Sequence, residues 1–77
     1  MAQKLTFEYD ADGDILLISK TAPYPEQETK ELGDDVIARM NPITREIENL
    51  EVLSWSSRLK GGGIFELPVS AVLRSAS

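Results

Sequence analysis

The start of the chain carries the pattern that most restricts its fold: an alternating strand, a tight turn and a second apolar run. Leu5, Phe7 and Tyr9 are each separated by one polar residue, so all three lie on one face of a half-buried strand. Asp12-Gly13 comes next, and the apolar run Ile15–Ile18 follows it. Asp-Gly between two apolar runs is a strong hairpin signal, because glycine accepts a positive φ angle and aspartate tolerates it. The chain is therefore predicted to begin with a β-hairpin.

Further strands are predicted downstream of this turn. Ile15–Ile18 is apolar on both faces, so we expect it in the interior of the sheet. The polar segment Gln27–Leu32 suits an edge strand, since charge discourages edge-to-edge aggregation. Val36–Met40 and Glu46–Trp55 complete the set, and the second of these has room for a bulge. The prediction is a mainly β domain of the α+β class, an antiparallel β-meander of four to five strands with one short C-terminal helix.

The segment after the last predicted strand changes character. Three consecutive glycines at 61–63 predict a flexible joint, because glycine loses the most conformational entropy on ordering. A short arm with Phe65 and Leu67 follows, and from Pro68 the apolar residues recur at helical spacing. They are Val69, Val72 and Leu73. A helix of about two turns is marginal alone, so it has to dock on the sheet or on a second subunit. The chain is predicted to be a single domain, 1–77, made of a β-meander (4–55), a glycine-rich joint (60–63), and an arm and helix (64–75).

Small size favours self-association. The chain has 77 residues, 42% of them hydrophobic, which suffices for one domain. A domain this short buries only about 60% of the surface of its unfolded chain and usually needs additional stabilisation. The absence of cysteine and histidine removes disulfides and Cys/His zinc sites from consideration. We therefore expect a homodimer.

Charge restricts the partners. The formal net charge is −5 and the pI near 4.5, so phosphate backbones and anionic membranes are disfavoured. No apolar run approaches the roughly 20 residues of a transmembrane helix, and no apolar segment that could act as a signal peptide follows the N-terminus. We expect a cytoplasmic protein that binds neither nucleic acid nor membrane.

The loop Asp10–Asp14 carries three aspartates at alternate positions and invites comparison with a calcium-binding loop. The EF-hand pattern needs glycine at position six and glutamate at position twelve. Here Gly13 falls at position four and Thr21 at position twelve. We interpret these carboxylates as decoration of an exposed hairpin and predict no metal site.

Glu51 is a second candidate for chemistry. A carboxylate among apolar residues either acts as a general base or is exposed or paired with arginine, and Arg39 and Arg58 are available. Nucleophile–histidine and cysteine–histidine arrangements are absent because neither histidine nor cysteine occurs. Lys60 does not belong to a phosphate-binding loop, since the required glycine spacing is missing. We predict no catalytic residue and no cofactor.

Trp55, Phe65 and Leu67 form the apolar group of most interest for binding. In so small a domain, part of this group could lie outside the core and form an interface, and an uncovered apolar patch commonly marks a contact surface. Packing in the core is the other interpretation, and the sequence leaves both open.

Three blocks of the chain carry a resemblance to a known family. Tyr9–Ile18, Glu28–Ile37 and Ile47–Leu53 are similar to its blocks YDPEADALYI, ETREVDDGVIVD and VVGIEIL, in the same order and spacing. On these residues the chain resembles domain of unknown function 2283 (DUF2283), a family of short bacterial proteins. The tail from Arg58 onward lies outside the resemblance.

The chain departs from the family pattern at a few positions. Asn49 stands where glycine is usual, Ser54 where an acidic residue is usual, and Leu17 where an aromatic is common. The resemblance implies a small β-rich unit with no established activity. Some relatives are encoded beside small toxin-like proteins, which implies an antitoxin-type binding role.

Two functions follow from these observations. The leading hypothesis is a small non-enzymatic binding or assembly module that forms a homodimer and has room for a protein partner. The alternative is a small enzyme or ligand-binding protein that uses Glu51 or the Asp10–Asp14 loop. A deep apolar pocket with converging polar groups would favour the alternative.

Overall fold

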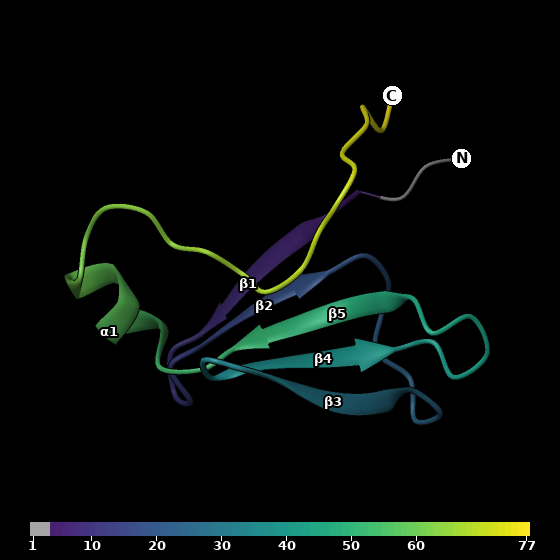
Figure 1. Cartoon of the computed structure of the whole chain (residues 1–77), viewed down its shortest axis with the longest axis horizontal. Coiled ribbons are helices and arrows are strands. Elements are labelled where there is room, and N and C mark those ends of the chain that lie inside the picture. Colours follow the sequence, from purple (N-terminus) through teal and green to yellow (C-terminus); the bar gives the residue numbers. More distant parts are fainter. Residues whose placement is uncertain (1–3) are drawn as a thin grey trace.

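The computed structural model describes residues 4–77, and predictions that concern residues 1–3 lie outside this range. These residues form one five-stranded sheet and one short helix (Figure 1). The elements in chain order are β1 (Thr6–Asp10), β2 (Ile15–Ser19), β3 (Glu28–Gly33), β4 (Val36–Met40), β5 (Ile47–Val52) and α1 (Trp55–Lys60). The predicted class, a mainly β antiparallel sheet with one short helix, is confirmed.

The strands lie in the order β1-β2-β5-β4-β3, with every neighbouring pair antiparallel. The chain leaves β2 for the far edge of the sheet, and β5 later returns between β2 and β4. The prediction of an interior position is confirmed for β2, and the prediction of a charged edge strand is confirmed for β3. Within β5, Arg39 of β4 is opposite Asn49 while Met40 is opposite Ile47, so Glu48 occupies a bulge, for which the sequence left room in this strand.

The core lies on one face of the sheet. Cross-strand partners share a face, and the register sets Leu16 opposite Val52 and Ile18 opposite Leu50. The buried apolar residues all come from the three interior strands, β2, β5 and β4: Ile18, Val36, Ala38, Met40, Leu50 and Val52. Alternate residues of these strands therefore build the apolar layer.

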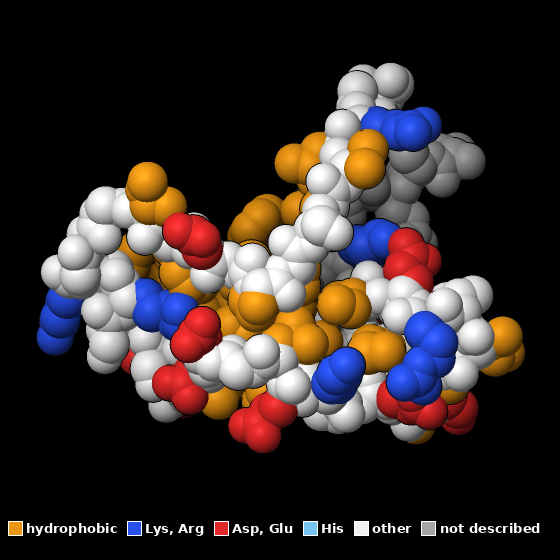
Figure 2. Space-filling model, viewed as in Figure 1, with side chains coloured by type: hydrophobic (Ala, Val, Ile, Leu, Met, Phe, Trp, Pro, Cys, Tyr) orange, Lys and Arg blue, Asp and Glu red, His pale blue; other side chains and the backbone are white. Residues whose placement is uncertain are grey.

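A C-terminal arm, residues 64–77, covers this layer. In Figure 1 it leaves α1 and runs across the face of the sheet, and in Figure 2 hydrophobic side chains gather on both sides of it. Phe65, Leu67 and Val69 pack against the core, while the residues between them face outward. The predicted helix within 64–75 is wrong, because no residue from Ile64 to Ser77 is helical. The apolar residues of the arm instead follow the two-residue spacing of extended chain. An extended arm places every second side chain on the sheet.

The helix is found earlier, at α1. Ser54 has a φ angle of 53°, which ends the extended backbone of β5. The basic residues Arg58 and Lys60 occupy the last turn, where cations suit the negative end of the helix dipole. No helix among the described residues has the length and apolar character to cross a membrane.

Side-chain hydrogen bonds hold the crossover between β2 and β3 to the bulged end of β5. Asn49 is buried; it donates to the backbone oxygen of Thr21 over 2.7 Å and accepts from the side-chain amide of Gln27 over 2.6 Å. Tyr24 donates its hydroxyl hydrogen to Glu48 over 2.6 Å. These bonds let polar residues be buried at one end of a small core, because a buried amide with partners avoids the cost of lost hydration.

Candidate functional site

The largest uncovered apolar feature of the sheet is a row of three side chains on β1 and the residue before it. Leu5, Phe7 and Tyr9 are 42%, 63% and 49% exposed. Phe7 is opposite Ile18 in the register, so the row belongs to the same face as the core. The arm packs on the core but leaves this row open. We call these three residues the β1 row.

Sequence reasoning assigned the β1 row to one face of a half-buried strand, but β1 is exposed along its whole length. The alternation of Leu5, Phe7 and Tyr9 was the correct signal for a shared face. It carried no information on whether anything covers that face, because coverage depends on where the arm lies.

The backbone edge of β1 is also open. Within residues 4–77, β1 pairs with β2 only, so the N–H and C=O groups on its outer side have no strand partner. The opposite edge of the sheet, β3, is better protected, since it has an irregular register between Glu31 and Gly33 and several charged side chains. An open apolar edge strand is a template for pairing with another chain.

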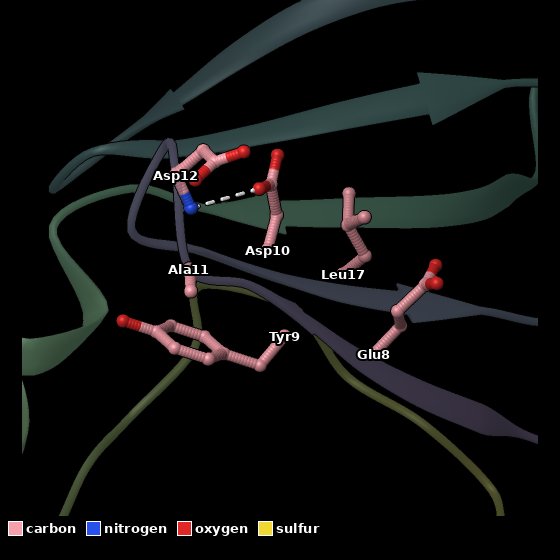
Figure 3. A pocket seen from close by; sticks show the side chains of 6 residues that line it. All are labelled: Glu8, Tyr9, Asp10, Ala11, Asp12 and Leu17. Atoms are coloured by element: carbon pink, nitrogen blue, oxygen red, sulfur yellow. Dashed lines mark hydrogen bonds between the residues drawn. The ribbon is translucent and has the colours of Figure 1, made fainter.

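The Asp10–Asp14 loop borders a shallow hollow of about 350 Å³ on the other side of β1 (Figure 3). Asp10 accepts hydrogen bonds from the backbone N–H groups of Asp12 and Gly13, which closes the turn. Asp14 does not line this hollow. The three aspartates of the loop do not converge, and no group of metal-ligating side chains large enough to hold an ion occurs in the described part of the chain.

Asp14 is instead bound to the start of α1. Its carboxylate accepts hydrogen bonds from the Ser56 hydroxyl, the Ser56 backbone N–H and the Tyr9 hydroxyl. The bonds from Ser56 and Tyr9 hold the pKa of the Asp14 carboxyl below its ordinary value. The same bond to Asp14 raises the pKa of the Tyr9 phenol. The Ser56 hydroxyl donates its hydrogen to the Asp14 carboxylate. We therefore interpret these hydrogen bonds as joining the first hairpin to α1.

Glu51 lies on the second face of the sheet, opposite Leu17 on one side and Ile37 on the other. Its carboxylate accepts two hydrogen bonds from Arg39, at 3.0 Å from Nε and 2.8 Å from an Nη atom. The side chains are 36% exposed for Arg39 and 18% for Glu51. Of the two interpretations of Glu51, pairing with arginine is the one that the geometry supports.

Trp55, Phe65 and Leu67 meet on the core side of the molecule. The rings of Trp55 and Phe65 are 5.1 Å apart between centroids in an edge-to-face arrangement, and the Arg58 guanidinium lies 4.7 Å from the centre of the Phe65 ring. Trp55, Phe65 and Leu67 are partly buried against the core of their own chain. Their role as an interface stays a prediction, and the β1 row is the more exposed apolar surface.

Comparison of the chain with protein-family models, with curated proteins and with solved structures found no match in any of the three. The resemblance to DUF2283 therefore stays a prediction from the three sequence blocks.

Proposed function

We propose that this protein is a small non-enzymatic assembly module that binds a second copy of itself through the β1 row. The observation that carries the proposal is an apolar row that continues the core face and that residues 4–77 leave about half exposed. With exposed fractions of 42%, 63% and 49%, the three side chains leave on the order of 300 Å² of mostly apolar surface in water. The largest apolar patch of a typical monomer has a comparable area and is often functional.

A non-enzymatic role is supported by the way the carboxylates are used. Asp14 binds the first turn of α1, Glu48 binds the crossover, and Glu51 is paired with Arg39. Each has a structural partner, and the hollow beside the Asp10–Asp14 loop is shallow and lined by few apolar side chains. Neither Glu51 nor the Asp10–Asp14 loop therefore lies in a deep apolar pocket with converging polar groups, which the alternative of a small enzyme or ligand-binding protein would require.

The remaining sequence predictions fit the same proposal. An antitoxin-type role, which the resemblance to DUF2283 implies, would present the β1 row to another protein instead of a second copy. The net charge of −5 supports binding to neither nucleic acid nor membrane. A cytoplasmic location remains part of the proposal.

The test is the dependence of mass on concentration, measured by sedimentation velocity for the full chain. We expect the wild type to dimerise in the micromolar range. F7S should weaken the dimer by about tenfold or more, because the substituted ring occurs in both copies. Circular dichroism should show F7S to be folded, since Phe7 is mostly exposed.

The matched control is I43S, which removes another exposed apolar side chain at a site far from β1 in the sequence and 88% exposed. It should leave the dimer unchanged. A wild type that stays monomeric throughout the micromolar range contradicts the proposal, and so does equal weakening by F7S and I43S.

A further inference from the structure

We infer that the second copy pairs edge to edge with β1, antiparallel and in the register that sets Phe7 opposite Phe7 of the other copy. The inference rests on the proposed function and adds the geometry of the contact. The β1 row alone leaves on the order of 300 Å² uncovered, which is less than the about 800 Å² per partner of a standard interface. The unpaired backbone edge of β1 can supply a further contribution, because a new strand pair adds main-chain hydrogen bonds and cross-strand side-chain contacts.

The side-chain period limits the registers. When a two-fold axis relates two antiparallel copies of one strand, the two residue numbers of every opposed pair have the same sum. If this sum is odd, each residue of the apolar row lies opposite a polar residue of the other copy. The reason is that a slip of one residue turns every side chain to the other face of the sheet. Only registers in which one residue is opposite itself keep the two rows on a common apolar face.

Charge then selects among the allowed registers. With Phe7 opposite itself, Lys4 is opposite Asp10 and Leu5 is opposite Tyr9, and symmetry repeats both pairs. Opposite charges and aromatic–aromatic pairs, here Phe7 with Phe7, are among the favourable cross-strand combinations. The end pairs therefore combine unlike charges. The pairs Leu5–Tyr9, Phe7–Phe7 and Tyr9–Leu5 are apolar on one face, and Thr6 is opposite Glu8 on the other.

The neighbouring registers are poorer. Centring on Glu8 sets two carboxylates directly against each other, which destabilises a strand pair. Centring on Thr6 also opposes unlike charges, Lys4 and Glu8, but it leaves Tyr9 opposite none of residues 4–77 and so removes apolar contacts from the pair. Phe7 is the only centre that opposes unlike charges and keeps the whole β1 row together.

The charged groups of this register are available. Asp10 uses Oδ1 for the two backbone N–H groups of its turn, and its Oδ2 accepts no hydrogen bond from residues 4–77. Lys4 is exposed, and the ion pairs found among the described residues involve other side chains. The pair between Lys4 and Asp10 of the other copy would therefore break no contact within the chain.

Single-cysteine variants test the register, and the cysteine-free chain makes them unambiguous. Opposed residues of antiparallel strands have Cα atoms about 4.5–5.5 Å apart, within the range that a disulfide spans. Because loss of the Phe7 ring weakens the dimer, the rates are compared at concentrations at which each variant is dimeric. There F7C should form a disulfide-linked dimer on the order of tenfold faster than L5C or Y9C alone. A mixture of L5C and Y9C should form the mixed dimer faster than either variant forms its own.

Charge exchange is the second test and does not require substitution in the row. K4E and D10K each set like charges against each other in a homodimer, whereas their mixture restores two pairs of unlike charges. We expect each variant to dimerise about tenfold more weakly than the wild type at low salt, and the mixture to form the heterodimer. If D10K does not fold, K4E alone suffices, because salt should strengthen its dimer and weaken the wild-type dimer.

The outcomes separate this inference from the proposed function. A dimer that F7S weakens, but in which F7C has no advantage over L5C and Y9C and K4E has no effect, overturns the register and leaves the proposed function standing. A chain that is monomeric in the micromolar range overturns both. Rapid F7C cross-linking together with preferred K4E–D10K heterodimers supports both.

Discussion

The carboxylate of Asp14 accepts two hydrogen bonds from Ser56, 2.6 Å from the hydroxyl and 3.0 Å from the backbone N–H. The backbone oxygen of Asp14 accepts a third bond from the N–H of Trp55 over 3.1 Å. The first hairpin thereby caps a helix that begins some forty residues later in the chain. α1 needs such a cap because Ser54, its own N-cap residue, makes no side-chain hydrogen bond to it.

The first prediction concerns this cap. The pKa of the Asp14 carboxyl is lowered in the fold, so its stabilising contribution is present above the ordinary carboxyl pKa of 3.8 and is lost as the pH falls below that value. D14N should lower the urea midpoint at neutral pH and reduce the dependence of stability on pH in the acid range. The control is D12N, since the Asp12 carboxylate accepts no hydrogen bond among residues 4–77. Equal effects of D14N and D12N would show that general charge, and not the cap, is responsible.

The second prediction concerns the crossover. The hydrogen bond to Glu48 raises the pKa of Tyr24 from 10.0 to about 12. The contribution of this bond is therefore present below pH 10.0 and is lost as the pH rises toward about 12. In a Y9F background, which leaves one tyrosine, absorbance of the phenolate should report the titration of Tyr24 directly. E48Q should bring the pKa back toward the ordinary value.

The matched control for E48Q is E26Q, because the charge of Glu26 is the smallest of the causes that raise the pKa of Tyr24. It should lower the pKa of Tyr24 by much less. A Tyr24 that titrates at the ordinary value in the otherwise unchanged protein would refute the hydrogen bond to Glu48.

The third prediction concerns the core. Val52 is fully buried and lies opposite Leu16 on one side and Val36 on the other. V52A should cost about 2 kcal/mol in the free energy of unfolding, from lost burial and the cavity that remains. The control I43A, at a side chain that is 88% exposed, should cost less than about 0.5 kcal/mol. Urea denaturation measures both, and a V52A cost no larger than that of I43A would contradict the placement of the core.

The fourth prediction concerns the ion pair on the second face of the sheet. A double-mutant cycle with R39A and E51A should give a coupling free energy of about 1 kcal/mol, since both side chains are partly exposed and doubly hydrogen-bonded. Thermal or urea unfolding of the four proteins provides the cycle. Additive effects of the two substitutions would mean that the pair contributes no net stability.

Much of the sheet was predictable from local pattern. The alternation before Asp12-Gly13 located the first hairpin, the apolar run Ile15–Ile18 located an interior strand, and the charged segment Gln27–Leu32 located an edge. These predictions succeeded because strand period and edge charge are written into neighbouring residues. The reason given for the first turn was wrong in detail, since the positive φ angle lies at Asp14 and not at Gly13. The arm was the main failure, since its apolar residues fit a helical period as well as a period of two. Only contact with the sheet decides between them.

The sequence by itself determined most of the strand residues and their apolar faces, and that neither cysteine nor histidine could supply a metal or nucleophile site. It was wrong to extend the last strand to Trp55, because β5 ends at Val52 and Trp55 begins α1. The tertiary structure alone decided that β5 enters between β2 and β4, that Asp14 caps α1, and that the arm covers the interior strands but not the β1 row. The physical reason is the distance along the chain over which each kind of interaction acts. Period and turn signals act between residues a few positions apart, whereas burial and exposure depend on contacts between segments that are distant in the chain.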